Sequence, residues 1–179
     1  MKPQTKEKIY LLIIVLLIAA CAQFYYTYQY TPAREIQVFY NKEHDLNREI
    51  MKVIREADER VYFAIYTFTR NDIKDALLSA KYRGVEVVGV TDKNQMASLE
   101  IQRKIVGELR KAVIPVYEQD HSAIMHIKTV VSEKAYASGS YNWTAAATNN
   151  NDEILEVGRD ESIRSQYEEI LKSLVKKYQ

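Results

Sequence analysis

The residue types best suited to chemistry on an oxyanion lie close together between residues 125 and 153. His126 and Lys128 are two positions apart, and in an extended strand such residues point to the same face. An imidazole beside a fixed ammonium combines a nucleophile or base with a positive charge. This pair therefore indicates chemistry on a negatively charged group.

The segment Met125 to Val131 is expected to be one strand of a hairpin, and Ala135 to Ser140 the other. In that register Ser140 lies opposite His126. Ser138 then lies opposite Lys128, and Asn142 follows at the strand end. These donors would converge on one pocket that suits a tetrahedral oxyanion, for which phosphate is the obvious candidate.

The same residues resemble the signature of the phospholipase D superfamily, in which His-x-Lys, an Asp and Gly-Ser-x-Asn recur. Here the pieces read His126-Ile127-Lys128 and Gly139-Ser140-Tyr141-Asn142, with Glu133 in the Asp place. Glu153 stands where small bacterial endonucleases of this superfamily carry a carboxylate that orients the catalytic histidine. The resemblance covers about residues 34 to 178 and indicates the compact, single-motif branch of the superfamily.

The resemblance implies a covalent phosphohistidine on His126, with Glu153 bonded to the far nitrogen of its ring. Lys128 and Asn142 would hold the nonbridging oxygens. Glu133 would fix Lys128 across the site; the alternative is a solvated carboxylate in a turn. We expect catalysis from His126, Lys128, Asn142 and Glu153, and substrate binding from Ser140, Ser138 and Glu133.

The leaving alkoxide needs a second proton donor, and this chain holds one such motif. The resemblance implies a homodimer in which both His126 side chains face one phosphate. We expect no cofactor and no metal, because the three histidines lack zinc-like spacing with the single cysteine and Lys128 would repel a cation. His44 and His121 are expected to be surface or loop residues.

Residues 1–30 are expected to be a signal peptide or membrane anchor. Three lysines precede an apolar run from Ile9 to Ala22, which would leave the amino end in the cytoplasm and export the body. Cleavage after Ala22, lipidation at Cys21 and retention as an anchor remain open. In each case the body would lie in the periplasm or on the extracytoplasmic face of the membrane.

Residues 31–179 are expected to form one α/β domain that follows a linker at Thr31-Pro32. Two runs, residues 60–67 and 85–91, are apolar on both faces, as central strands covered on both sides must be. Further strands are expected at 36–40, 113–117 and 153–157, and helices at 45–57, 71–82, 96–111 and 162–177, with a polar loop at 148–151. This pattern predicts a mixed β-sheet sandwiched between helical layers.

The whole chain has a formal net charge of +1, and without residues 1–22, which hold three lysines and one glutamate, it has −1. Nucleic-acid binding must therefore come from a local patch. The leading hypothesis is an exported or anchored endonuclease that hydrolyses DNA or RNA. The second is a phospholipase D or cardiolipin-type lipid hydrolase. The third, motivated by Glu133 in the Asp place, is a non-catalytic dimer that binds polyanions.

Overall fold

The computed structural model describes residues 3–30 and 36–179, and its internal contacts divide the chain into two units, Met1–Ala33 and Arg34–Gln179. The first unit is the helix α1, Pro3–Tyr30. Its stretch Lys6–Tyr26 has a mean hydropathy of 2.3, so it is long and apolar enough to cross a membrane, although a signal sequence has the same properties. The expected linker Thr31-Pro32 lies outside the described residues.

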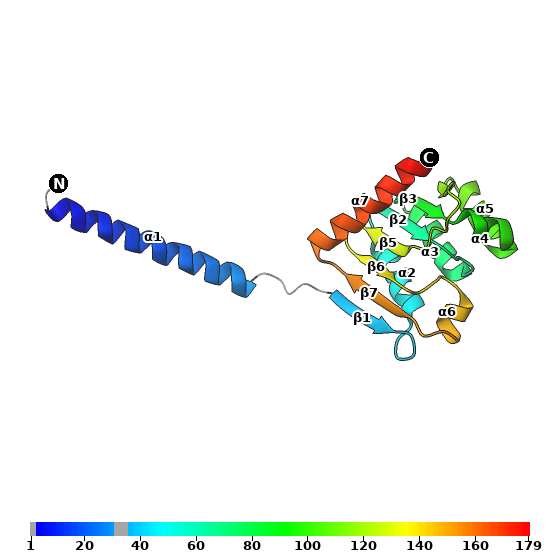
Figure 1. Ribbon diagram of the computed structural model, residues 1–179, viewed down its shortest axis with the longest axis horizontal. Coiled ribbons are helices and arrows are strands. Elements are labelled where there is room, and N and C mark those ends of the chain that lie inside the picture. Colours follow the sequence, from blue (N-terminus) through cyan, green and yellow to red (C-terminus); the bar gives the residue numbers. More distant parts are fainter. Residues whose placement is uncertain (1–2, 31–35) are drawn as a thin grey trace. The chain divides into compact units, whose positions relative to one another are not determined.

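The second unit is built on a seven-stranded sheet in the order β1-β7-β6-β5-β2-β3-β4 (Figure 1). Strands β2, β3 and β4 are parallel, and each remaining neighbour pair is antiparallel. The strands are β1 Ile36–Tyr40, β2 Arg60–Ile65, β3 Glu86–Thr91, β4 Val116–Glu118, β5 Lys128–Ser132, β6 Tyr136–Gly139 and β7 Ile154–Gly158. The predicted mixed sheet is confirmed.

Helices cover both faces of this sheet. Alternate residues of its central strands point to opposite faces, and both sets are buried. Phe63 of β2 lies in a core with α2, α3 and α5, whereas Tyr62 and Ala64 pack against α7, which crosses the other face (Figure 1). The helices are α2 Leu46–Glu56, α3 Asn71–Tyr82, α4 Lys93–Ser98, α5 Glu100–Lys111, α6 Ala145–Asn149 and α7 Glu161–Tyr178. The sheet is therefore sandwiched between helical layers, as the sequence predicted.

Several predicted boundaries are wrong. The single helix expected at residues 96–111 is two helices, because Asp92 caps an earlier start and Leu99 is extended. Part of the loop expected at residues 148–151 belongs to α6, which Thr144 caps. The strand expected from residue 113 begins only at Val116, since Val113 has a φ of 60°, which no strand accommodates.

Gly139 lies where β6 passes very close to β7. A Cβ atom built on Gly139 would lie 2.2 Å from the carbonyl oxygen of Ile154, so any side chain would push the two strands apart. We expect Gly139→Ala to lower the free energy of unfolding by about 1–3 kcal/mol, measured by urea denaturation.

Gly107 provides the matched control for this substitution. It lies in α5, and a Cβ atom there would meet nothing within 4 Å. Gly107→Ala should therefore raise the free energy of unfolding by about 0.5–1 kcal/mol. Equal stability of Gly139→Ala and the wild type would show that the two strands are not in such close contact.

Glu168 joins α7 to the sheet through a cluster of ion pairs. Its carboxylate accepts hydrogen bonds from Arg60 Nε at 2.6 Å and Arg164 Nη1 at 2.8 Å, and it pairs with Lys172 Nζ at 2.6 Å. Burial opposes ionisation of Glu168, but these three partners outweigh it and lower its pKa to about 2. The carboxylate is therefore charged at neutral pH, although the residue is only 6% exposed.

We expect this cluster to make the fold sensitive to acid. The pKa of Glu168 falls from 4.5 to about 2 on folding. Glu168 therefore contributes fully to the free energy of unfolding above pH 4.5, and this contribution is lost as the pH approaches 2. The loss should be on the order of 3 kcal/mol. Urea denaturation across this pH range should show that Glu168→Gln removes this part of the pH dependence and that Glu169→Gln, at an exposed neighbour, keeps it in full. An unchanged slope in Glu168→Gln would contradict this account.

Candidate active site

One edge of the sheet gathers most of the residues that the sequence singled out. Strands β2, β3 and β6 end at this edge, and β5 and β7 begin there, because β5 is antiparallel to β2 and β7 to β6. The residues that these strand ends bring to the same edge are Tyr66, Asp92, His126, Lys128, Ser140, Asn142 and Glu153.

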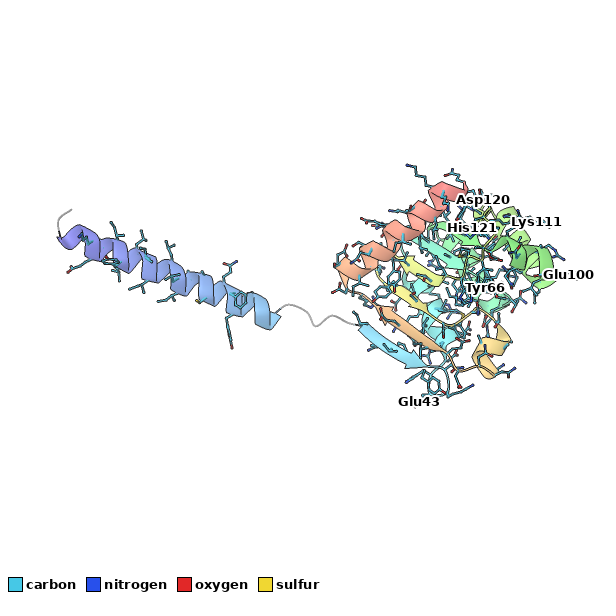
Figure 2. The ribbon with its side chains drawn as sticks, in the orientation of Figure 1. Glu43, Tyr66, Glu100, Lys111, Asp120 and His121 are labelled. Carbon is cyan, nitrogen blue, oxygen red and sulfur yellow. The ribbon has the colours of Figure 1, made fainter. Side chains whose placement is uncertain are left out.

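His126 lies in an irregular segment immediately before β5 and has an exposed side chain. Its ring packs edge-on against the ring of Tyr66, with centroids 4.8 Å apart and planes at 62°. The Tyr66 amide donates to the carbonyl of Ile127 at 2.9 Å, which continues the β2–β5 ladder up to the histidine. Figure 2 labels Tyr66 in the part of the domain near α4 and α5, and Gln95 of α4 and Gln102 of α5 both donate hydrogen bonds to it. The imidazole is thus open to solvent on a fixed aromatic support.

Lys128 is buried beside this histidine and is only 6% exposed. Its Nζ donates to the carbonyl oxygen of His126 at 2.8 Å and lies 5.3 Å from the centroid of the Tyr66 ring. Burial lowers the pKa of Lys128, and the negative charge of Glu153 acts in the opposite direction. The predicted pairing of one imidazole with one held cation is therefore present, although the strand begins three residues later than expected.

Glu153 makes other contacts than the one expected. Its carboxylate accepts hydrogen bonds from Ser140 Oγ and from Asn151 Nδ2, the latter at 3.0 Å. Ser140 Oγ in turn accepts from the Ile154 amide at 3.1 Å. Within the described residues no hydrogen bond joins Glu153 to His126. Ser140 thus holds Glu153, and that carboxylate acts electrostatically on Lys128.

The backbone beside Asn142 is fixed by the next residue, Trp143, which pairs with the segment that follows β2. The Trp143 amide donates to the carbonyl of Thr67 at 3.1 Å, and the Trp143 carbonyl accepts from the Thr69 amide at 2.8 Å. Oδ1 of Asn142 is buried and lacks a hydrogen-bond partner in the part of the chain that the structure describes. An unpaired buried acceptor costs about 1–3 kcal/mol. A donor on a ligand, or a turn of the amide that presents its NH₂ to a phosphate, would relieve this cost.

Ser138 lies in the interior of the sheet rather than in the pocket. The observed register pairs Thr129 with Ser138, so the expected pairing of Ser138 with Lys128 is wrong by one residue. The two hydroxyls are 2.8 Å apart and satisfy each other. A shift of one residue moves each side chain to the other face of its strand, which is why the serine faces a threonine here.

The structure does not bring Glu133 to the other predicted residues. It follows the far end of β5, about 17 Å along the strand from Lys128. Its carboxylate accepts from the amides of Asp58 at 2.8 Å and Arg60 at 3.2 Å. Burial opposes its ionisation, but these amides lower the pKa of Glu133. Glu133 therefore anchors a turn at the opposite edge of the sheet and does not fix Lys128.

Sequence reasoning missed Gln102, which supports the site. Gln102 of α5 is fully buried and donates to the carbonyl of Tyr66 at 3.1 Å and to Thr91 Oγ1 at 2.9 Å. Asp92 accepts from the Met125 amide at 2.8 Å. Asp92 directly follows a strand that is buried on both faces, where a polar side chain can line a site, whereas Gln102 lies within a helix and its position gives no such signal.

The remaining histidines lie elsewhere. His44 is exposed and packs edge-on against Phe39, and His121 lies in the loop after β4, beside Tyr178 at the end of α7 (Figure 2). Within residues 3–30 and 36–179, no group of three or more His, Cys, Asp or Glu side chains is arranged to hold a metal ion.

Comparisons with known protein families, sequences and structures all find proteins of the phospholipase D-like type. Residues 50–175 match the family described as "Cardiolipin synthase, PLD-like domain". Mitochondrial cardiolipin hydrolase of Xenopus tropicalis is 30% identical over 130 residues, which are 72% of this chain and 60% of that protein. The chain thus spans less than two thirds of the length of this relative.

Two solved structures share the fold. Nuc from Salmonella typhimurium, a phospholipase D family member, has a TM-score of 0.73 at 25% identity, covering 79% of this chain and 93% of that one. NucT from Helicobacter pylori has a TM-score of 0.73 at 23% identity, covering 82% and 98%. Since the family model matches more than half of the chain and the motif residues meet at one edge of this fold, the protein belongs to the phospholipase D-like family.

Proposed function

We propose that the protein is a phosphodiesterase, and specifically an endonuclease that hydrolyses DNA or RNA through a covalent phosphohistidine. The observation that carries the proposal is the exposed imidazole of His126 held beside the buried ammonium of Lys128. A neutral imidazole is a competent nucleophile at phosphorus. A fixed ammonium stabilises the charge that develops on the nonbridging oxygens.

The reaction has two displacements at phosphorus. In the first, a ring nitrogen of His126 forms a bond to phosphorus while the bond to the leaving oxygen breaks, and that oxygen takes a proton from a second imidazole. In the second, a water molecule gives a proton to that imidazole and attacks phosphorus, and the P–N bond to His126 breaks. Lys128 and the amide of Asn142 bind the nonbridging oxygens throughout. No step calls on a metal, so we expect activity to survive EDTA.

The second imidazole would come from His126 of a second copy of the chain. Two apolar side chains beside the site support this homodimer, because Ile124 is 52% exposed and Ile154 is 55% exposed. A two-fold axis through the site supplies both imidazoles from one sequence. Mixed dimers of wild type and His126→Ala should therefore be inactive, and full activity per wild-type subunit in such dimers would rule out a shared site.

The likeness in fold to Nuc supports a nuclease, since the two structures match with a TM-score of 0.73 over 93% of the Nuc chain. The second candidate is a lipid phosphodiesterase, and the observation that favours it is the exposed pair Ile124 and Ile154 beside the site together with the apolar helix α1. We further propose that the body lies on the extracytoplasmic face of the membrane, supported by the lysines that precede the apolar stretch.

The test uses the full chain in detergent micelles. Single-stranded DNA, duplex DNA, RNA and cardiolipin vesicles are each supplied in EDTA, with His126→Ala as the control. Cleavage of nucleic acid by the wild type alone supports the nuclease, and turnover of lipid alone supports the second candidate. Binding of all four substrates without turnover would contradict both and leave a module that binds polyanions.

A further inference from the structure

The carboxylate of Asp92 is fully buried directly beneath the segment that carries His126. Its Oδ1 accepts from the Gln95 amide at 2.9 Å and caps α4. Its Oδ2 accepts from the Met125 amide at 2.8 Å and from Gln119 Nε2 at 3.1 Å. Met125 directly precedes His126, so one oxygen of this carboxylate fixes the backbone next to the imidazole.

Capping α4 does not account for this arrangement. A cap needs one oxygen, which an asparagine or serine supplies equally well, and α4 has only six residues. The second oxygen serves groups that are 27 and 33 positions along the chain. Burial opposes the ionisation of Asp92, but the amides of Met125 and Gln95 outweigh it and lower its pKa. The ionised form of Asp92 is thus stabilised by its bond to the Met125 amide, next to His126, as well as by its bond to the Gln95 amide in α4.

A second route leads from the same carboxylate to the other side of the imidazole. Asp92 fixes the backbone of Gln95, whose side-chain Nε2 donates to the Tyr66 hydroxyl at 3.1 Å. Gln95 Oε1 accepts from Thr67 Oγ1 at 3.1 Å, which orients the amide. The Tyr66 ring is the surface against which the His126 ring packs. The backbone position of His126 and the contact of its ring with Tyr66 therefore both depend on hydrogen bonds that Asp92 accepts.

We propose that Asp92 is a positioning residue for the nucleophile, acting on His126 through the Met125 amide and through Gln95 and Tyr66. This rests on the proposed function, because it takes His126 as the reacting group. A nucleophile displaced by about 1 Å can lose about a hundredfold in rate. The effect belongs in the chemical step and not in substrate binding, since Asp92 is fully buried and cannot reach substrate.

The discriminating variant is Asp92→Asn in the full chain. The new side chain keeps an oxygen for the Gln95 amide, so the cap remains, but it presents NH₂ where the Met125 amide needs an acceptor. We expect kcat per active site to fall by about tenfold or more, with KM within about twofold of the wild type. Active sites are counted by the burst of phosphohistidine, so a loss of folded protein does not count as a loss of rate.

Asp160→Asn is the matched control, because Asp160 caps α7 and accepts from the Ile163 amide at the opposite edge of the sheet. It should keep the wild-type kcat. Gln95→Ala keeps the Asp92 bonds and removes the route through Tyr66, and we expect about a threefold or larger fall in kcat per site. This variant decides the proposal if Asp92→Asn fails to fold.

The outcomes separate this inference from the function on which it rests. If the wild type turns over no substrate, or if His126→Ala remains active, the proposed function fails whatever Asp92 does. If turnover requires His126 and Asp92→Asn matches the wild type per active site, the positioning role alone is overturned. A change confined to KM, or to the number of active sites, overturns it as well.

Discussion

His126→Ala is expected to lower kcat by about a thousandfold or more, because in the proposed mechanism it removes the atom that forms the bond to phosphorus. The fold should be nearly unaffected. The side chain is exposed, and its ring contact with Tyr66 accounts for about 1 kcal/mol at most. Initial rates on whichever of the four test substrates the wild type turns over, together with urea denaturation, measure the two effects separately.

His44→Ala is the matched control for this variant. His44 is also exposed, and its ring also packs edge-on against an aromatic ring, that of Phe39, with centroids 5.2 Å apart. Loss of either histidine should therefore change stability by a similar amount, and only the loss of His126 should change turnover. Retention of more than about a tenth of the rate by His126→Ala would refute the covalent mechanism.

Lys128→Met should produce the second largest loss, with kcat lowered by about a hundredfold or more. Methionine keeps the apolar length of the side chain and removes the charge that we propose stabilises the nonbridging oxygens. Stability should be unchanged or higher, because a buried ammonium has lost its hydration and has the His126 carbonyl as its hydrogen-bond partner. Rates and thermal denaturation on the same preparation test both statements.

Lys74 offers a control lysine of similar burial. Its side chain is 13% exposed and pairs with Glu108 at 2.6 Å, on the helical layer formed by α3 and α5. Lys74→Met should leave turnover unchanged. A rate for Lys128→Met within threefold of the wild type would mean that the ammonium serves the fold and not the reaction.

The sequence predicted the helical layers, the sheet and the pair His126 and Lys128, and it did so for a physical reason. A strand buried on both faces, such as β2, is almost wholly apolar, and the period of α7 places Ile163, Leu171 and Leu174 against the sheet. These patterns depend on neighbours in the chain, so the sequence displays them directly. His126 and Lys128 are likewise neighbours, and the structure keeps them together.

The predictions that failed depend on contacts that the spacing of the motif does not show. The register of β5 with β6 was misjudged by one residue because Ser132 belongs to the hairpin strand and not to the turn: its amide donates to the Ala135 carbonyl at 2.8 Å, so the turn holds only Glu133 and Lys134. Glu133 was placed in the site because its position in the motif suggested it, but its hydrogen bonds go to amides 73 and 75 positions earlier. Spacing alone carries no information about such bonds.

The position of β7 controls when the site can exist. This last strand lies between the first strand, β1, and β6, so β1 has no neighbour in the sheet until β7 arrives. The arrival of β7 is also what brings Glu153 to the lysine. A polypeptide that emerges amino end first therefore cannot complete this sheet, or bring Glu153 to Lys128, until the residues of β7 have been synthesised.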